Sequence, residues 1–286
     1  MTYEIVAKQT LTAEELAQIN ELVRLCNEHD GIDLKINPDM LQNRSGKHTE
    51  DFLCYADGKL VGFLGLYVFH RKEAEASGMV HPDYRRKGIF SGLQRAAEEE
   101  CKQREIPSLL FIVQHNSQSG AAYMQQIGAT YEHSEHWMDL GEGGRQTCND
   151  TLRIRPETAD DYETLIQLNV HGFQMKEQQV REMAEMMASD LNSRTYMVIV
   201  EEEAVGKISV SRKDAKAFIY GFCVHPDHQG KGYGRQALAQ TIRLIEEEGY
   251  KHVSLEVACE NSKALGLYES CGFAVKSAND YYRLNL

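Results

Sequence analysis

The stretch Val224-His225-Pro226-Asp227-His228-Gln229-Gly230-Lys231-Gly232-Tyr233-Gly234 has a near-copy earlier in the chain, Val80-His81-Pro82-Asp83-Tyr84-Arg85-Arg86-Lys87-Gly88-Ile89-Phe90. The histidines at the second position of the two copies carry the numbers 225 and 81, so the repeat distance is 144 residues. A repeat of this length is far too long for a solenoid unit but has the size of a whole domain. The sequence therefore predicts two tandem copies of one fold, in residues 1–143 and 151–286.

Each copy combines an apolar strand, a turn and the start of a helix. In the second copy the turn contains Gly230, Gly232 and Gly234. Backbone N–H groups at such a turn point outward at a helix N-terminus, where unpaired donors and the helix macrodipole favour a phosphate group. Glycine permits the close approach of an anion and the positive φ that the turn can require. An ordinary loop is the alternative interpretation of these glycines.

A second duplicated pattern lies downstream and favours a binding site over an ordinary loop. Asn261 is followed seven residues later by Tyr268, and Asn116 is followed seven residues later by Tyr123. The two segments then run into Gly272-Phe273 and Gly128-Ala129. The shared spacing indicates that the whole surroundings of the turn were duplicated with it.

With both patterns in view, each half resembles a GCN5-related N-acetyltransferase domain, whose acetyl-CoA signature is Gln/Arg-x-x-Gly-x-Gly/Ala. Gln229, Gly232 and Gly234 fit this signature fully, whereas Arg85 and Gly88 are followed by Phe90 at its last position. The resemblance implies an α/β fold with two tandem domains, each a mixed, mostly antiparallel sheet flanked by helices. It also implies acetyl-CoA as the cofactor.

The resemblance implies cofactor contacts in both halves. In the second half these come from Cys223, Val224, Gln229, Gly230, Lys231, Gly232, Tyr233, Gly234, Arg235 and Asn261. A second, less complete site in the first half would use Val80, Arg85, Arg86, Lys87, Gly88, Ile89, Phe90 and Asn116. The cations at the two turns suit a polyanionic cofactor, although they also fit solvated turn residues.

Acetyl transfer to an alkyl amine needs a base, because such an amine with a pKa near ~10 is mostly protonated at neutral pH. Glu256 precedes Tyr268 by twelve residues. The same spacing occurs in ribosomal-protein alanine acetyltransferases, which implies Glu256 as the base and Tyr268 as the proton donor to the departing sulfur. A solvent-facing strand residue and a core ring are the alternatives for these two. Phe111 stands at the position equivalent to Glu256, so we expect catalysis in the second half.

Composition limits the function classes. The formal net charge of −12 argues against a nucleic-acid partner, whose binding needs an excess of Lys and Arg. No apolar run approaches the ~20 residues of a membrane span, and Met1 leads directly into a strand-like segment, so neither a membrane anchor nor a signal peptide is expected. The seven cysteines have no metal-ligand spacing, which predicts no metal site and a reduced, cytoplasmic protein. Buried thiols are expected at Cys223, Cys259 and Cys271.

Periodicity predicts matching elements in the two halves. Expected in the first half are a strand at Tyr3–Ala7, a helix from Thr12, a hairpin over 52–69, a strand at 109–113 and a helix at Asn116, followed by a joint at 141–144. Expected in the second half are a strand at 152–155, helices near 158 and over 177–191, strands at 196–200, 205–210 and 218–224, a helix from Gly234 to Gly249, a strand at 252–257, a helix at Asn261 and strands at 273–275 and 281–284.

Three functional interpretations stay open at this level. The favoured one is an acetyl-CoA-dependent N-acetyltransferase that acts on a small-molecule amine or a peptide N-terminus. A catalytically silent acyl-CoA-binding or regulatory protein is the alternative, and a mycothiol-synthase-like enzyme is an alternative subclass. The first half would bind CoA weakly, shape the substrate cleft or only support the fold. Acceptor contacts are expected in residues 24–50 and 170–194, because substrate contacts in such folds come from variable segments.

Overall fold

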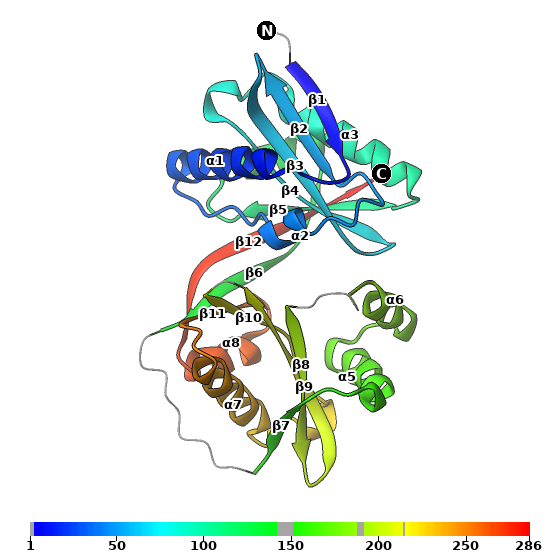
Figure 1. The fold of residues 1–286 in the computed structure, drawn as a ribbon, viewed down its shortest axis with the longest axis vertical. Coiled ribbons are helices and arrows are strands. Elements are labelled where there is room, and N and C mark those ends of the chain that lie inside the picture. Colours follow the sequence, from blue (N-terminus) through cyan, green and yellow to red (C-terminus); the bar gives the residue numbers. More distant parts are fainter. Residues whose placement is uncertain (1–2, 142–150, 188–191, 214) are drawn as a thin grey trace. The chain divides into compact units, whose positions relative to one another are not determined.

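The computed structural model describes residues 3–141, 151–187, 192–213 and 215–286. The chain divides into two compact units, Met1–Ser134 with Ser277–Leu286 and Glu135–Lys276 (Figure 1). We call these the first and the second unit. They differ from the halves expected at 1–143 and 151–286 because residues 135–140 and 277–286 each group with the other repeat. Of the joint expected at 141–144, only Gly141 lies within the described residues.

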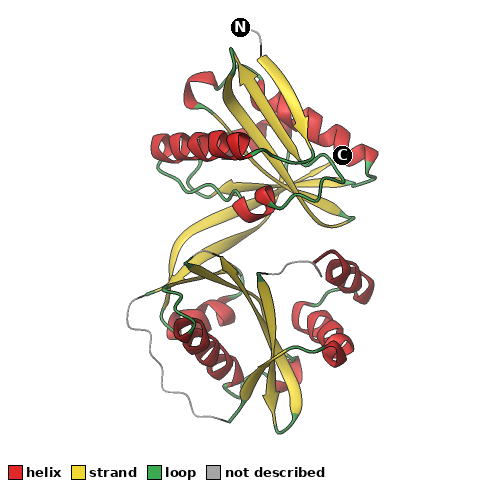
Figure 2. Cartoon of the chain, in the orientation of Figure 1, coloured by secondary structure: helices red, strands yellow, loops and turns green. Residues whose placement is uncertain are grey.

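The first unit is a mixed sheet with helices on both sides (Figures 1 and 2). Its strands run in the order β1-β2-β3-β4-β5-β12, and the only parallel pair among them is β4 with β5. The strands are β1 (Tyr3–Lys8), β2 (Asp51–Ala56), β3 (Lys59–His70), β4 (Glu73–Val80), β5 (Ser108–Gln114) and part of β12 (Phe273–Asn285). The helices are α1 (Ala13–Asp30), α2 (Pro38–Gln42), α3 (Ile89–Gln103) and α4 (Gln118–Ile127).

The second unit repeats this plan. Its strands run in the order β6-β11-β10-β9-β8-β7, again with one parallel pair, β10 with β11. The strands are part of β6 (Thr130–Leu140), β7 (Arg153–Pro156), β8 (Ser193–Val200), β9 (Glu203–Lys213), β10 (Lys216–Val224) and β11 (His252–Ala258). The helices are α5 (Tyr162–Phe173), α6 (Glu177–Met187), α7 (Tyr233–Glu247) and α8 (Ser262–Ser270). The predicted mixed, mostly antiparallel tandem fold is confirmed.

Each sheet takes one strand segment from the distant repeat. In the first unit, Asn279–Asn285 of β12 pairs antiparallel with Ser108–Gln114 of β5. In the second unit, Glu135–Asp139 of β6 pairs antiparallel with Ser254–Ala258 of β11. The last strand of the chain therefore covers β5, whose seven residues are all buried. Covering the strand satisfies its backbone groups, which an exposed edge would leave unpaired.

Apolar residues on both faces of each sheet explain why the helices pack there. In the first unit, α3 and α4 pack on one face around Leu93 and Met124, and α1 packs on the other around Ile19. In the second unit, α7 and α8 cover one face around Leu238, and α5 covers the other around Leu168. None of the described helices is long and apolar enough to cross a membrane.

Two predicted elements differ in detail. The helix expected at Asn116 begins at Gln118, because the Ser117 hydroxyl accepts a hydrogen bond from the Gly120 N–H and supplies the cap. The two strands expected at 273–275 and 281–284 are one continuous strand, β12. The end of the helix expected over 177–191 lies outside the described residues, which include α6 as far as Met187.

Candidate active site

The two parallel strands of the second unit separate toward their carboxyl ends. β10 and β11 are paired only from Lys216 to Ile219 on one strand and from His252 to Leu255 on the other. The pairing of β10 with β9 is irregular between Tyr220 and Cys223, which marks a bulge. Gly221 within this bulge has a φ of 54°. An opening thus forms between β10 and β11, directly before the glycine-containing turn.

The turn presents an open helix N-terminus at this point. Gly230 and Gly232 have φ values of 76° and 81°, and a Cβ built on either would meet no atom within 4 Å. Gly232 caps α7 without a side-chain hydrogen bond, and the first turn of α7 contains no acidic residue. The free N–H groups and the empty space fit the diphosphate of the predicted cofactor.

Other predicted binding residues shape the turn. The Gln229 side-chain amide donates a hydrogen bond of 3.0 Å to the carbonyl oxygen of Val224. Lys231 and Arg235 are exposed beside the turn, where their charges face solvent, and Tyr233 begins α7. At Gly234 a Cβ would lie 3.3 Å from Leu267 of α8, so glycine here lets α7 and α8 approach closely.

Glu256 and Tyr268 come from β11 and α8, the two elements that follow α7 in the chain. Glu256 is half-buried on β11, and its Cα partner across the sheet is Trp137 of β6. Tyr268 lies in the core beside α7, with 8% of its surface exposed. Burial raises the pKa of its phenol to about 12, helped by the nearby Cys223 and Cys271, so the hydroxyl keeps its proton at neutral pH.

The remaining predicted residues have mainly structural contacts. The Asn261 side-chain oxygen caps α8 by accepting a hydrogen bond of 3.0 Å from the Ala264 N–H. The Cys223 thiol is buried and donates to the carbonyl oxygen of Leu168, and burial raises its pKa above the ordinary value. Cys271 is buried and Cys259 is half-buried, so the expectation of buried thiols holds for Cys223 and Cys271.

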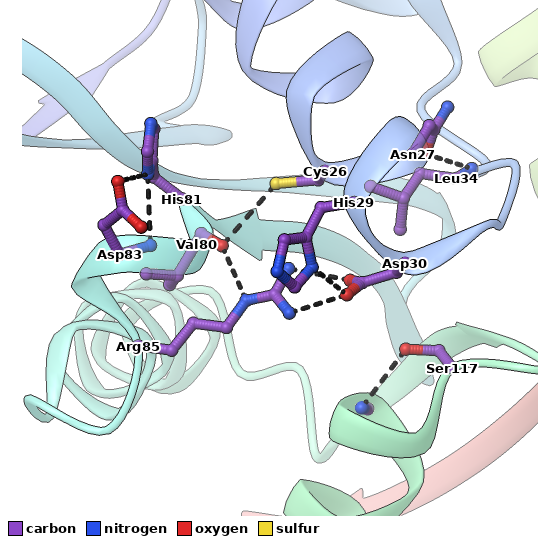
Figure 3. Close-up of polar contacts among 11 residues, drawn as sticks. Cys26, Asn27, His29, Asp30, Leu34, Val80, His81, Asp83, Arg85 and Ser117 are labelled. Atoms are coloured by element: carbon purple, nitrogen blue, oxygen red, sulfur yellow. Dashed lines mark hydrogen bonds and ion pairs between the residues drawn. The ribbon is translucent and has the colours of Figure 1, made fainter.

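In the first unit an ion pair lies where the second unit has Gln229. The Arg85 guanidinium reaches from the turn after β4 to the Asp30 carboxylate at the end of α1, with contacts of 2.8 and 2.7 Å (Figure 3). Its Nε also donates to the carbonyl oxygen of Val80, which accepts a further contact from Cys26. Arg85 therefore joins α1 to the turn, and the Asp30 carboxylate compensates its charge.

The rest of the first-unit site is filled by side chains. The Phe90 ring packs edge-on against Tyr123, with 4.9 Å between centroids, and the Tyr123 hydroxyl is bonded to Ser91 and Gln94. Arg86 has a φ of 61° at the position of Gly230.

Phe111, which the sequence aligned with Glu256, is 2% exposed and faces the core under α3 and α4, as Leu255 faces the core under α7 and α8, so this alignment is wrong by one residue. The β5 residue on the face of Glu256 is the buried Ile112, which pairs with Tyr281 as Glu256 pairs with Trp137.

The other residues predicted for this second site, Gly88, Ile89, Asn116 and Lys87, have local structural contacts. Gly88 caps α3 with a φ of 78°, as Gly232 caps α7. Ile89 is buried, whereas Asn116 is exposed and its N–H donates to the Gln114 side chain. The Lys87 ammonium donates to the carbonyl oxygen of Asp83.

Sequence reasoning missed two features of the second-unit face that carries α5. Trp137, Phe218 and Tyr220 form a row of rings, with centroid separations of 5.4 and 6.3 Å. Lys207 of β9 is buried on the same face, 7% exposed. The internal repeat could have identified Lys207, because Gly206-Lys207 aligns with Gly62-Phe63 and a lysine therefore replaces an apolar strand residue. A groove of about 830 Å³ between β7, β8 and α7 contains none of the predicted catalytic or cofactor-binding residues, and of the segments expected to contact the acceptor it contains Arg194.

The comparisons with known proteins agree with this geometry. The family model described as Acetyltransferase (GNAT) family matches residues 16–129 and 155–273. A mycothiol acetyltransferase of Propionibacterium freudenreichii is 28% identical over 297 residues, which cover 95% of this chain and 89% of the relative. The ribosomal protein bS18-alanine N-acetyltransferase of Escherichia coli is 40% identical over 58 residues, 20% of this chain and 39% of the relative.

Two solved structures share the fold along the whole chain. A GCN5-related N-acetyltransferase from Sphaerobacter thermophilus superposes with a TM-score of 0.81 at 19% identity, covering 98% of this chain and 95% of the other. A tandem GNAT protein from the clavulanic acid biosynthesis pathway superposes with a TM-score of 0.74 at 18% identity, covering 99% and 98%. The tandem arrangement therefore occurs in other proteins of this size.

Proposed function

The chain belongs to the acetyltransferase (GNAT) family, and on that premise we propose that its second unit moves the acetyl group of acetyl-CoA to the primary amine of a small molecule. The observation that carries the proposal is the N-terminus of α7, which has no side-chain cap, with open space at Gly230 and Gly232. The N–H groups there would hold the diphosphate, and Lys231 and Arg235 would add positive charge. When bound, acetyl-CoA supplies the thioester as the acetyl donor.

Glu256 is the proposed base. It takes a proton from the acceptor ammonium, directly or through a water, so that the neutral amine can attack the carbonyl carbon. A new C–N bond forms as the C–S bond breaks, and the attacking nitrogen then loses its second proton to water, which returns a proton to Tyr268. Tyr268 donates the phenolic proton, or a hydrogen bond, to the departing sulfur, a role for which its raised pKa keeps it protonated.

The first unit is proposed to support the fold rather than to catalyse. Its β5 residue at the register position of Glu256 is the buried Ile112, and Phe90 packs edge-on against Tyr123 beside its turn. The Arg85 charge is compensated by Asp30 and is not available to an anionic cofactor. These contacts favour a single CoA site, in the second unit.

A small-molecule acceptor is favoured over a peptide N-terminus. The mycothiol acetyltransferase relative matches across both units, whereas the ribosomal-protein acetyltransferase matches a short segment. A mycothiol-type acceptor is therefore the second candidate function. A cytoplasmic location is part of the proposal, because all six cysteines among the described residues are free thiols.

The experiment that tests the proposal is a panel of amines, peptides and aminoglycosides offered with acetyl-CoA, with free thiol release as the readout. Turnover above hydrolysis with at least one small amine is expected. Tight CoA binding by calorimetry without any amine-dependent thiol release would instead establish the silent acyl-CoA-binding protein. Saturating turnover with peptides alone would transfer the assignment to a peptide N-terminal acetyltransferase.

A further inference from the structure

Lys207 is a buried cation that forms no ion pair with any residue the structure describes. It lies on β9 between Met197 of β8 and Cys223 of β10, and 7% of its surface is exposed. Its ammonium sits 5.6 Å from the centroid of the Phe173 ring at the end of α5. Its ammonium donates no hydrogen bond to a side chain among the described residues, and the Cys223 thiol and the Glu157 carboxylate act on it electrostatically without direct contact.

The backbone of β10 leaves room for this ammonium. Gly221 lies in the bulge with a φ of 54°, and a Cβ there would come within 3.0 Å of the Lys207 nitrogen. The same Cβ would lie 3.7 Å from the Ser209 hydroxyl, which is paired with Thr195 at 2.9 Å. Lys207 and Ser209 thus place a cation and a hydroxyl beside the point where β10 leaves β11.

The first unit is an internal control for this position. The register pairs Gly206 with Val224 and Gly62 with Val80, so Phe63 is the structural counterpart of Lys207. Phe63 is fully buried in an apolar core. The fold thus accepts an apolar side chain here, and burying an ammonium without a partner costs free energy. Burial also lowers the pKa of Lys207. A bound anion would remove this cost.

We propose that Lys207 binds a carboxylate of the acceptor, so that the substrate is an amine that also carries a carboxylate, as an amino acid does. The inference rests on the proposed function of the second unit. The acceptor side is favoured because Lys207 shares the α5 face with the ring row of Trp137, Phe218 and Tyr220, and Glu256 pairs across the sheet with Trp137 of that row. A monovalent carboxylate is favoured over a phosphate, since one ammonium faces the ligand and Glu157 would repel a second negative charge.

The test compares acceptors that differ only in the carboxylate. Amino acids and their amides are offered with acetyl-CoA to the full chain, and KM and kcat are measured for each pair. The wild type should use the acid with a KM at least about tenfold lower, the ratio that one charge-assisted contact supplies. Lys207→Met should remove this preference without changing the amide kinetics. Lys216→Met, which removes an exposed cation from the neighbouring strand, should preserve it.

Two further measurements separate this inference from the proposed function. N-acetyl amino acids and their amides are titrated into the CoA-loaded protein, which needs no turnover. Lys207-dependent binding of the acid without any thiol release would keep the carboxylate site and overturn the proposed function. Thiol release with equal use of acids and amides, unchanged in Lys207→Met, would overturn the carboxylate site alone.

The donor is the other source of a carboxylate. Succinyl-CoA is therefore compared with acetyl-CoA in the same assay. A Lys207-dependent preference for succinyl-CoA would place the anion on the acyl group and overturn the acceptor assignment. Absence of both turnover and acid binding would overturn the inference as well.

Because Phe63 shows that an apolar residue fits at this position of the fold, Lys207→Met should unfold at or above the wild-type temperature.

Discussion

The hydroxyl of Tyr123 donates a hydrogen bond to the side-chain oxygen of Gln94. Leu238 stands at the matching position of α7, so this contact has no counterpart at Tyr268. The same tyrosine is thus fixed by α3 in the first unit and faces an apolar neighbour in the second. This difference agrees with a structural role for Tyr123 and with the proposed role of Tyr268 as a proton donor.

Removing the proposed base should stop turnover. Glu256→Gln keeps the shape of the side chain but cannot accept a proton, so kcat should fall by about 100-fold or more. Thiol release at saturating acetyl-CoA measures the effect. Tyr123→Phe is the matched control in the first unit and should leave kcat within about twofold. A large loss from Tyr123→Phe with little loss from Glu256→Gln would reverse the assignment of the catalytic unit.

Removing the proposed proton donor should slow the reaction without abolishing it. A thiolate whose conjugate acid has a pKa near ~8.5 is already a tolerable leaving group, so Tyr268→Phe should lower kcat by about tenfold. An unchanged kcat would contradict the assigned role. The KM for acetyl-CoA should change little, because the phenol is not among the groups proposed to hold the diphosphate.

The same variant carries a pH prediction. The Tyr268 pKa is raised to about 12 by burial, so the folded protein binds this proton more tightly than the unfolded chain does. The resulting stabilisation is complete below about pH 10, the ordinary tyrosine pKa, and is lost as pH rises toward the folded value. Urea unfolding between these pH values should show a smaller loss of stability in Tyr268→Phe than in the wild type. Equal losses of stability in the two proteins would show that folding does not raise the pKa of the Tyr268 phenol.

A charge placed in the turn should weaken cofactor binding. Asp and Asn both tolerate positive φ, and a Cβ at position 230 meets no atom within 4 Å, so Gly230→Asp and Gly230→Asn should both fold. The Asp carboxylate would repel the diphosphate and raise the Kd of acetyl-CoA by about tenfold or more. The neutral Asn should change the Kd far less.

Calorimetry of acetyl-CoA binding to the wild type should give one site per chain, and two equal sites would contradict a silent first unit.

The C-terminal strand should be needed by the first unit. A chain that ends at Lys276 lacks the strand that covers β5 and the Arg283 guanidinium, which contacts Glu73 and Glu132 at 2.6 Å. Amides of β5 should then lose protection from hydrogen exchange, because their partner strand is gone. Arg283→Ala, which keeps the strand, should retain most of that protection. Full protection of β5 in the shortened chain would contradict the observed pairing.

Local chemistry explains how much of the site could be predicted. The turn at Gly230 and Gly232 depends on positive φ and on a helix start, and both are properties of adjacent residues. The duplication then identified two copies of one fold. Spacing aligned Phe111 with Glu256, whereas the strand register assigns Ile112 to that position, because one more residue separates β11 from Asn261 than separates β5 from Asn116. Neither residue can act as a base, so the first copy lacks the proposed base in either alignment. Periodicity was enough for most strands and helices because each buries one face.

What the sequence alone determined is therefore the tandem fold and the glycine-containing turn before α7, and it named Glu256 and Tyr268 as the candidate pair. Tertiary structure alone decided that 277–286 belongs to the first unit, that Arg85 is neutralised by Asp30 and that Lys207 is buried with no ion pair among the described residues. Each of these joins residues far apart in the chain. Spacing reports only local backbone geometry, whereas burial and charge pairing depend on which distant strands and helices meet.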